Sequence, residues 1–265
     1  MQQILTYTFL TLYTVTILGI VLVIITDNRN PLKTLPWIIV LLLAGLVFYF
    51  FFGQNLSKQR IISRRTRKRI TLQLEEAEHT GCPDLPEQYR PLAQLLRRTC
   101  HAVPLYGSRI TPYTDGGAKM EALLGEIARA HHHIHLQYYI LSDDETGRRL
   151  RDALAAKARE GVRVRILYDD VGCSGVKKAF FREMREAGIE VHAFLHVKFP
   201  RFTSKVNYRN HRKIVVIDGR TGFIGGMNIA DRYVRGTEWG SWRDTHFRIE
   251  GSGVAGLQIA FLSDW

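Results

Sequence analysis

Residues 207–233 read NYRNHRKIVVIDGRTGFIGGMNIADRY, and the pattern within them decides the fold. Two short apolar runs, IVVI and TGFIG, flank the turn sequence DGR. β-Branched residues favour strands, and an Asp-Gly pair favours a tight turn between two strands. We therefore expect a strand, a turn and a second strand, which would return the sequence GGMN to the neighbourhood of His211.

Strands and helices also alternate upstream of this stretch. Apolar runs predict strands at residues 134–141, 162–170 and 189–195, and amphipathic periodicity predicts helices at residues 114–130, 148–160 and 174–188. Such alternation implies helices layered on a sheet. The fold class expected for this part of the chain is therefore α/β.

The N-terminal part has a different composition. Two runs without a charged residue, 4–25 and 36–53, each have about the length that a helix needs to cross hydrocarbon. A cleaved signal peptide is the alternative for the first run, but that run is long for a signal sequence and no small-x-small site follows it. We expect two transmembrane helices in residues 1–57, a basic and helical linker in residues 58–105, and a catalytic domain in residues 106–265.

Basic residues follow the second apolar run. They are Lys58, Arg60, Arg64, Arg65, Arg67, Lys68 and Arg69. By the positive-inside rule they place the rest of the chain in the cytoplasm, so we expect a multi-pass membrane protein. The cluster is either a topology signal alone or also a surface that attracts anionic lipid. The net charge of +12 likewise indicates a polyanionic partner: nucleic acid, anionic lipid or a phosphorylated substrate.

Cysteine and histidine usage argues against a disulfide framework or a metal site. The three cysteines, Cys82, Cys100 and Cys173, indicate reduced thiols. Neither they nor the histidines at positions 131–133 and 135 have the paired spacing of a zinc site. We expect no metal and no cofactor. Asp169 and Asp170, at the end of a predicted strand, are interpreted as turn residues.

His211 and Lys213 form the pair most suited to chemistry. They are two positions apart, so on a strand they would project from the same face. A neutral imidazole is a nucleophile near pH 7, and a neighbouring ammonium can neutralise the charge of a phosphate under attack. Gly225 and Gly226 permit a close backbone approach, and Asn228 can donate hydrogen bonds to oxygens. The pattern favours phosphoryl or phosphatidyl transfer.

This constellation resembles a known signature. His211-x-Lys213, Asp218 and Gly225-Gly226-x-Asn228 are similar to the HKD motif of the phospholipase D superfamily, and NYRNHRKIVVIDG, GFIGGMNIAD and WRDTHFRIEG resemble stretches of bacterial cardiolipin synthases. The resemblance implies two transmembrane helices followed by an α/β/α sandwich half with a mixed sheet.

The resemblance also implies an activity. One histidine attacks the phosphorus of phosphatidylglycerol, a second protonates the departing glycerol, and another phosphatidylglycerol accepts the phosphatidyl group to give cardiolipin, without metal or cofactor. The expected partners are phosphatidylglycerol, other anionic phospholipids and the membrane, and no nucleic acid. Two alternatives are a phospholipase D-type hydrolase and an inactive, membrane-tethered module that binds anionic lipid.

By the same resemblance, His211, Lys213 and Asp218 are the catalytic set. His211 would be the nucleophile or its acid/base partner, and Lys213 and Asn228 would bind phosphate oxygens. Asp218, however, lies seven residues from His211, which puts it on the opposite face of an unbroken strand. We therefore expect Asp218 to shape the turn and Asp244, in WRDTH, to orient the His211 imidazole. Tyr208 and Arg209 flank the histidine and either contact the headgroup or face solvent.

The chain departs from the family in holding one HKD motif where such synthases carry two. The second motif would come from a missing C-terminal half or from a second copy of the chain, and a chain without either would be inactive. We expect a fragment, because the final residues, FLSDW, resemble no element that could cover a face of the sheet in place of a partner half.

Overall fold

The computed structural model describes residues 85–100, 102, 104–194, 196 and 209–265, together with residues 11, 14, 15 and 18. Both predicted transmembrane runs, apart from those four positions, and the basic cluster lie outside the described residues. Within the described part, no helix has both the length and the apolar character needed to cross a membrane. The described residues from 85 onward belong to one compact unit, Ser57–Val197 with Tyr208–Trp265.

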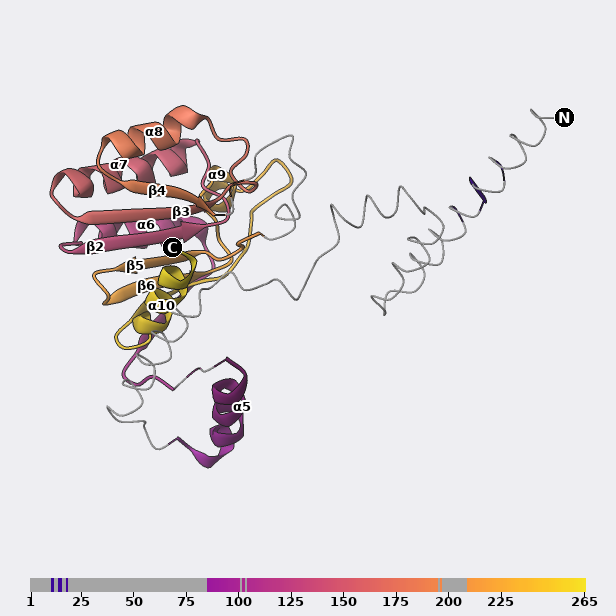
Figure 1. Ribbon diagram of the computed structural model, residues 1–265, viewed down its shortest axis with the longest axis vertical. Coiled ribbons are helices and arrows are strands. Elements are labelled where there is room, and N and C mark those ends of the chain that lie inside the picture. The colour runs from indigo at the N-terminus through magenta and orange to yellow at the C-terminus, as the bar shows by residue number, and fades with distance from the viewer. Residues whose placement is uncertain are drawn as a thin grey trace. The chain divides into compact units, whose positions relative to one another are not determined.

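A seven-stranded sheet organises the described part of this unit, in the order β1-β7-β6-β5-β2-β3-β4 (Figure 1). The strands are β1 (Arg109–Tyr113), β2 (His133–Tyr138), β3 (Arg163–Asp169), β4 (Glu190–Phe194), β5 (Ile214–Ile217), β6 (Thr221–Gly225) and β7 (His246–Glu250). The neighbours β2, β3 and β4 run parallel, whereas the other adjacent pairs are antiparallel. The α/β fold with a mixed sheet is confirmed.

Helices lie on both faces of the sheet. The helices of the described part are η3 (Glu87–Tyr89), α5 (Arg90–Cys100), α6 (Gly116–Ala128), α7 (Glu145–Arg159), α8 (Lys178–Glu186), α9 (Asp231–Arg235) and α10 (Val254–Asp264), and those that cover the sheet are α6, α7, α8 and α10. Figure 1 shows α7 and α8 beside β3 and β4, and α10 beside β5 and β6. Because crossover helices connect the parallel strands, the strands in the middle of the sheet are covered twice.

Strand β5 shows this double burial in four residues. Val215 and Ile217 belong to the main core, which also takes in buried side chains of α6, α7 and α8. Ile214 and Val216 point to the other face and pack with Val254 and Leu257 of α10. A strand with both faces in apolar surroundings needs a continuous apolar run rather than alternation, which explains the sequence IVVI.

Helix α10 corrects one expectation. The last residues do cover a face of the sheet, since α10 packs against β5, β2 and β6. Phe261, near its end, is fully buried against Leu167 and Phe194. The helix is apolar over most of its length, so its sequence lacks the polar face by which an amphipathic helix is identified.

Candidate active site

His211 and Lys213 lie in the segment that leads into β5. The prediction that they stand within a strand is wrong, because β5 begins at Ile214. The two side chains nevertheless meet: the Lys213 Nζ lies 3.0 Å from His211 Nδ1 and donates to the His211 carbonyl oxygen over 2.7 Å. His211 is exposed, whereas Lys213 is buried. The pair therefore presents an accessible imidazole on a buried ammonium.

Tyr139, which follows β2, completes this contact. Its ring centroid lies 4.5 Å from that of His211, and the Lys213 Nζ lies 5.4 Å from the Tyr139 centroid. The aromatic face attracts the ammonium and limits where the imidazole can turn. Sequence reasoning missed Tyr139, because its position after a buried strand does not reveal that the His211 segment packs against it.

The protonation states suit nucleophilic chemistry near neutral pH. Burial, assisted by the charge of Lys213, lowers the pKa of His211 although Asp169 opposes this. Burial also lowers the pKa of Lys213 to about 8, against the opposing charge of Asp244. At pH 7 the imidazole is therefore neutral while most of the ammonium keeps its charge.

The contact also selects a histidine tautomer. A charged Lys213 can only donate, so His211 Nδ1 accepts and the neutral ring carries its proton on Nε2. In this form Nε2 has no free lone pair with which to attack phosphorus. Attack by Nε2 requires the proton to sit on Nδ1 instead, and a carboxylate acceptor at Nδ1 would favour that form.

Asp244 lies close enough to this pair for its charge to act on Lys213. Its carboxylate accepts the Thr245 N–H at 2.6 Å, and a side chain added at Gly226 would reach within 2.1 Å of Asp244 Oδ1. The glycine is thus required for Asp244 to stand where it does. Since His211 Nδ1 contacts Lys213 here, the orienting role of Asp244 stays a prediction.

Asp218 lies at the other end of β5 from His211, and the four-residue strand between them is itself about 13 Å long. It occupies the β5–β6 turn with a φ of 52°. Its carboxylate accepts three backbone N–H groups, from His131, His132 and His133, at 2.8–2.9 Å. These contacts agree with a turn-shaping residue that ties β5 to the start of β2, and none joins it to the His211 ring.

Asn228 lies in the loop after β6. Its amide oxygen accepts the Ile140 N–H at 3.1 Å and its amide nitrogen donates to the Tyr233 hydroxyl at 2.7 Å. The side chain is buried, so in this conformation it holds the loop after β2 against the loop after β6. The amide nitrogen has a second hydrogen that these two contacts do not use.

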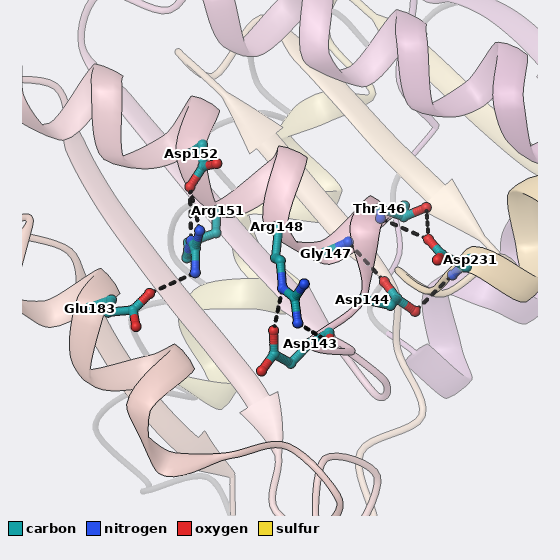
Figure 2. Close-up of polar contacts among 9 residues, drawn as sticks. All are labelled: Asp143, Asp144, Thr146, Gly147, Arg148, Arg151, Asp152, Glu183 and Asp231. Carbon is teal, nitrogen blue, oxygen red and sulfur yellow. Dashed lines mark hydrogen bonds and ion pairs between the residues drawn. The ribbon is translucent and has the colours of Figure 1, made fainter.

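Two aspartates fix the same pair of loops, as Figure 2 shows. Asp144 caps α7 through the Gly147 N–H at 3.0 Å, and its other oxygen accepts the Asp231 N–H at 2.8 Å. Asp231 in return accepts both the N–H and the hydroxyl of Thr146. This reciprocal capping stabilises the first turn of α7 and fixes the loop that carries Asn228.

Asp169, interpreted from sequence as a turn residue, does more than close a turn. It accepts the N–H groups of Val171 and Gly172, and its second oxygen accepts the Asn210 N–H at 3.0 Å. Arg209 pairs with it at 3.5 Å and its side chain is largely buried, so of the two alternatives for Arg209 the structure does not support exposure to solvent. Tyr208 lies outside the described residues. Asp169 thus anchors the chain immediately before His211.

Lys119 of α6 is a further buried lysine. It donates to the Tyr138 hydroxyl at 3.0 Å, and burial lowers its pKa to about 7. His246, at the start of β7, is fully buried, and neither ring nitrogen has a hydrogen-bond partner within the described structure. Burial, with the charges of Lys119 and Lys213, keeps this imidazole neutral by lowering its pKa.

Among the described residues, the other candidate ligands have contacts of their own. His133 and His135 share the side chain of Gln258, and Cys173 is a buried free thiol. In the described part of the chain, no group of three or more His, Cys, Asp or Glu side chains is placed to hold a metal ion.

Comparison with known proteins identifies the class of this domain as phospholipase D-like. Residues 123–240 match the family model described as "Cardiolipin synthase, PLD-like domain". The chain is 39% identical over 262 residues to the major cardiolipin synthase ClsA of Bacillus subtilis, covering 94% of this chain and 54% of that protein. A cardiolipin synthase of Geobacillus kaustophilus is 39% identical over 97% of this chain and 53% of its own length.

Solved structures with similar folds include NucT from Helicobacter pylori. It has a TM-score of 0.47 and 14% identity, over 60% of this chain and 96% of that chain. Nuc from Salmonella typhimurium, a phospholipase D family member, has a TM-score of 0.44 and 18% identity, over 60% and 93%.

Residues 123–240 therefore belong to the family of cardiolipin synthase PLD-like domains, and the chain is similar over most of its length to curated cardiolipin synthases. It spans about half the length of the curated relatives that it matches, consistent with an N-terminal half.

Proposed function

We propose that this chain is one half of a phosphatidyltransferase that makes cardiolipin from two molecules of phosphatidylglycerol. One observation carries the proposal: the neutral, exposed His211 imidazole rests on the buried Lys213 ammonium at 3.0 Å, in a chain of this family. The family supports the reaction class, and the pair supplies a nucleophile beside a positive charge.

The proposed first step forms a phosphorus–nitrogen bond. His211 Nε2 attacks the phosphorus of phosphatidylglycerol, the bond from phosphorus to the glycerol headgroup breaks, and a histidine of a second HKD half gives that glycerol a proton. Lys213 and the free amide hydrogen of Asn228 stabilise the charge that develops on the phosphate oxygens.

The second step reverses these roles. A hydroxyl of another phosphatidylglycerol attacks the phosphorus, its proton passes to the second histidine, and the phosphorus–nitrogen bond breaks to release cardiolipin. In the contact seen here His211 Nδ1 accepts from Lys213, so attack requires a change of tautomer. We propose that the Asp244 carboxylate accepts a hydrogen bond from His211 Nδ1–H and so stabilises the tautomer that attacks.

The second half is supplied by a longer chain or by a second copy. We place the active domain at residues 106–265, preceded by the linker 58–105 and by two membrane helices in residues 1–57. In this arrangement the catalytic domain lies on the cytoplasmic side of the inner membrane, where the phospholipid substrate is found.

The test supplies labelled phosphatidylglycerol to membranes that contain the chain, alone or with the complementary half of the Bacillus subtilis relative. We expect cardiolipin and free glycerol in at least one arm, and neither product with His211→Ala. Phosphatidic acid as the sole product would indicate a hydrolase instead. Absence of turnover in both arms, or full turnover by His211→Ala, would overturn the proposal.

A further inference from the structure

The segment around His211 is bound by a residue of α10, a helix that has no part in the proposed chemistry. Asp264, the last residue of α10, has a largely buried side chain. One of its carboxylate oxygens accepts from Asn210 Nδ2 at 2.7 Å and also binds the Arg212 guanidinium. Asn210 and Arg212 are the two sequence neighbours of His211, so a single carboxylate binds the residue on each side of His211.

The segment needs such support because residues 211–213 precede the first strand residue and have no ladder hydrogen bonds of β5. Within the segment, the Arg212 N–H donates to the Asn210 amide oxygen at 3.1 Å. The buried Asn210 side chain therefore connects the Asp264 carboxylate to the backbone of Arg212. A polar segment outside regular structure keeps one conformation only where side chains satisfy its backbone.

Asp264 is itself fixed. Gln137 of β2 donates to the same carboxylate oxygen at 2.7 Å. One helical turn earlier, Phe261 is fully buried and stacks on His135 with ring centroids 4.6 Å apart. The carboxylate thus stands on a helix end anchored in the core, and its place relative to β5 is set by the packing of α10 on the sheet.

The hydrogen bonds and ion pair of the Asp264 side chain all lead to the His211 segment or to β2.

We propose that Asp264 is a positioning residue of the active site, which holds His211 in its attacking position by binding Asn210 and Arg212. The inference rests on the proposed function, because it assigns Asp264 a role in that reaction. A displacement of about 1 Å at the nucleophile can cost on the order of a hundredfold in rate.

The test compares Asp264→Asn with Ser263→Ala in the assay of labelled phosphatidylglycerol. The Asp264→Asn substitution keeps the size of the side chain but removes the ion pair with Arg212. Ser263, the neighbouring residue, donates to the Ile259 carbonyl within its own helix. We expect kcat to fall about ten- to a hundredfold in Asp264→Asn with KM within about twofold, and no change in Ser263→Ala.

Two further measurements separate positioning from folding. Arg212→Gln combined with Asp264→Asn should be no slower than the slower single variant, because both remove the same contact. In the full chain labelled with 13C-histidine, the ring signal that disappears in His211→Ala should shift in Asp264→Asn and stay in place in Ser263→Ala. This spectrum needs no turnover.

The outcomes are distinct for the two proposals. If His211→Ala keeps full turnover, the proposed function fails. If His211→Ala is inactive while Asp264→Asn keeps the wild-type kcat and an unshifted His211 signal, the positioning role alone is wrong. A loss of turnover that matches the loss of folded protein would also overturn it.

Discussion

Replacing Asp218 separates a turn-forming residue from a member of the catalytic machinery. Its carboxylate accepts three backbone N–H groups, and its backbone has a φ of 52°, which aspartate and asparagine tolerate better than alanine. Hydrogen bonds to a charged acceptor contribute about 1.5–3 kcal/mol each when buried. This turn is partly exposed, so water replaces part of each bond and about 1 kcal/mol each is the appropriate figure.

Asp218→Ala should therefore lose roughly 3–4 kcal/mol of unfolding free energy, with the positive φ included. Asp218→Asn keeps the oxygen that accepts from His132 and His133 but sets an amide donor against the His131 N–H, so it should lose about 1–2 kcal/mol. Arg220→Ala, at an exposed position of the same turn, should change stability by less than about 0.5 kcal/mol.

The pH dependence of the unfolding free energy gives an independent test of the role of Asp218. Burial opposes ionisation of Asp218, but the three N–H donors outweigh it and the pKa lies below the ordinary value of 3.8. A carboxyl with a lowered pKa in the folded state contributes stability above its ordinary pKa, and that contribution is lost as the pH falls. The deficit of Asp218→Asn relative to wild type should therefore shrink below about pH 4.

The assay is equilibrium unfolding in urea followed by tryptophan fluorescence, together with turnover measured where both proteins are folded. Asp218→Asn should retain turnover within a few-fold of wild type, in contrast to His211→Ala. Turnover as low as that of His211→Ala with undiminished stability would place Asp218 in the chemistry and refute the turn-forming role.

Three other predictions follow from buried charges and close contacts. Lys119→Met should be more stable than wild type at pH 7 and below. Its advantage in unfolding free energy should fall by up to about 1.4 kcal/mol per pH unit from pH 7 towards 10.5, because the folded-state pKa of Lys119 of about 7 lies below the ordinary 10.5. Urea unfolding at several pH values measures this difference. Gly226→Ala should cost about 1–3 kcal/mol and displace the Asp244 carboxylate, with a marked loss of turnover. The pH profile of turnover should rise through a pKa below 6.5, when His211 becomes neutral, and fall near 8, when Lys213 loses its charge.

Gly256→Ala is the control for Gly226→Ala. Gly256 lies in α10 with open space where a Cβ would stand, so alanine should raise stability by about 0.5–1 kcal/mol and leave turnover unchanged. Equal effects of the two substitutions would contradict the close approach of Gly226 to Asp244. An upper limb of the pH profile far above pH 8 would contradict a charged Lys213 as the required form.

Local sequence was sufficient for the strands and the turn. The run IVVI, the Asp218-Gly219 turn and TGFIG became β5, a positive-φ turn and β6, since β-branched residues and an Asp-Gly pair restrict their own backbone. The spacing of His211 and Lys213 also predicted their meeting, although the strand that was to align them begins one residue later.

The supporting residues could not be found in this way. Asp264 lies 53 residues after His211, and Asp169 lies 42 residues before it, so only the folded sheet brings them to the same segment. Tyr139 and Lys119 have ordinary places in the strand and helix patterns. Their roles depend on which face each element buries and against what, which sequence periodicity does not specify.

The most direct measurement is to trap the covalent intermediate. The chain, alone or with the complementary half of the Bacillus subtilis relative, is incubated with phosphatidylglycerol, quenched in alkali, digested and analysed by mass spectrometry. The phosphatidyl group should be found on His211, and it should be absent when Lys213 is replaced by methionine. A phosphatidyl group on another residue of this chain, or turnover without any modified His211, would contradict the assignment of His211 as the nucleophile.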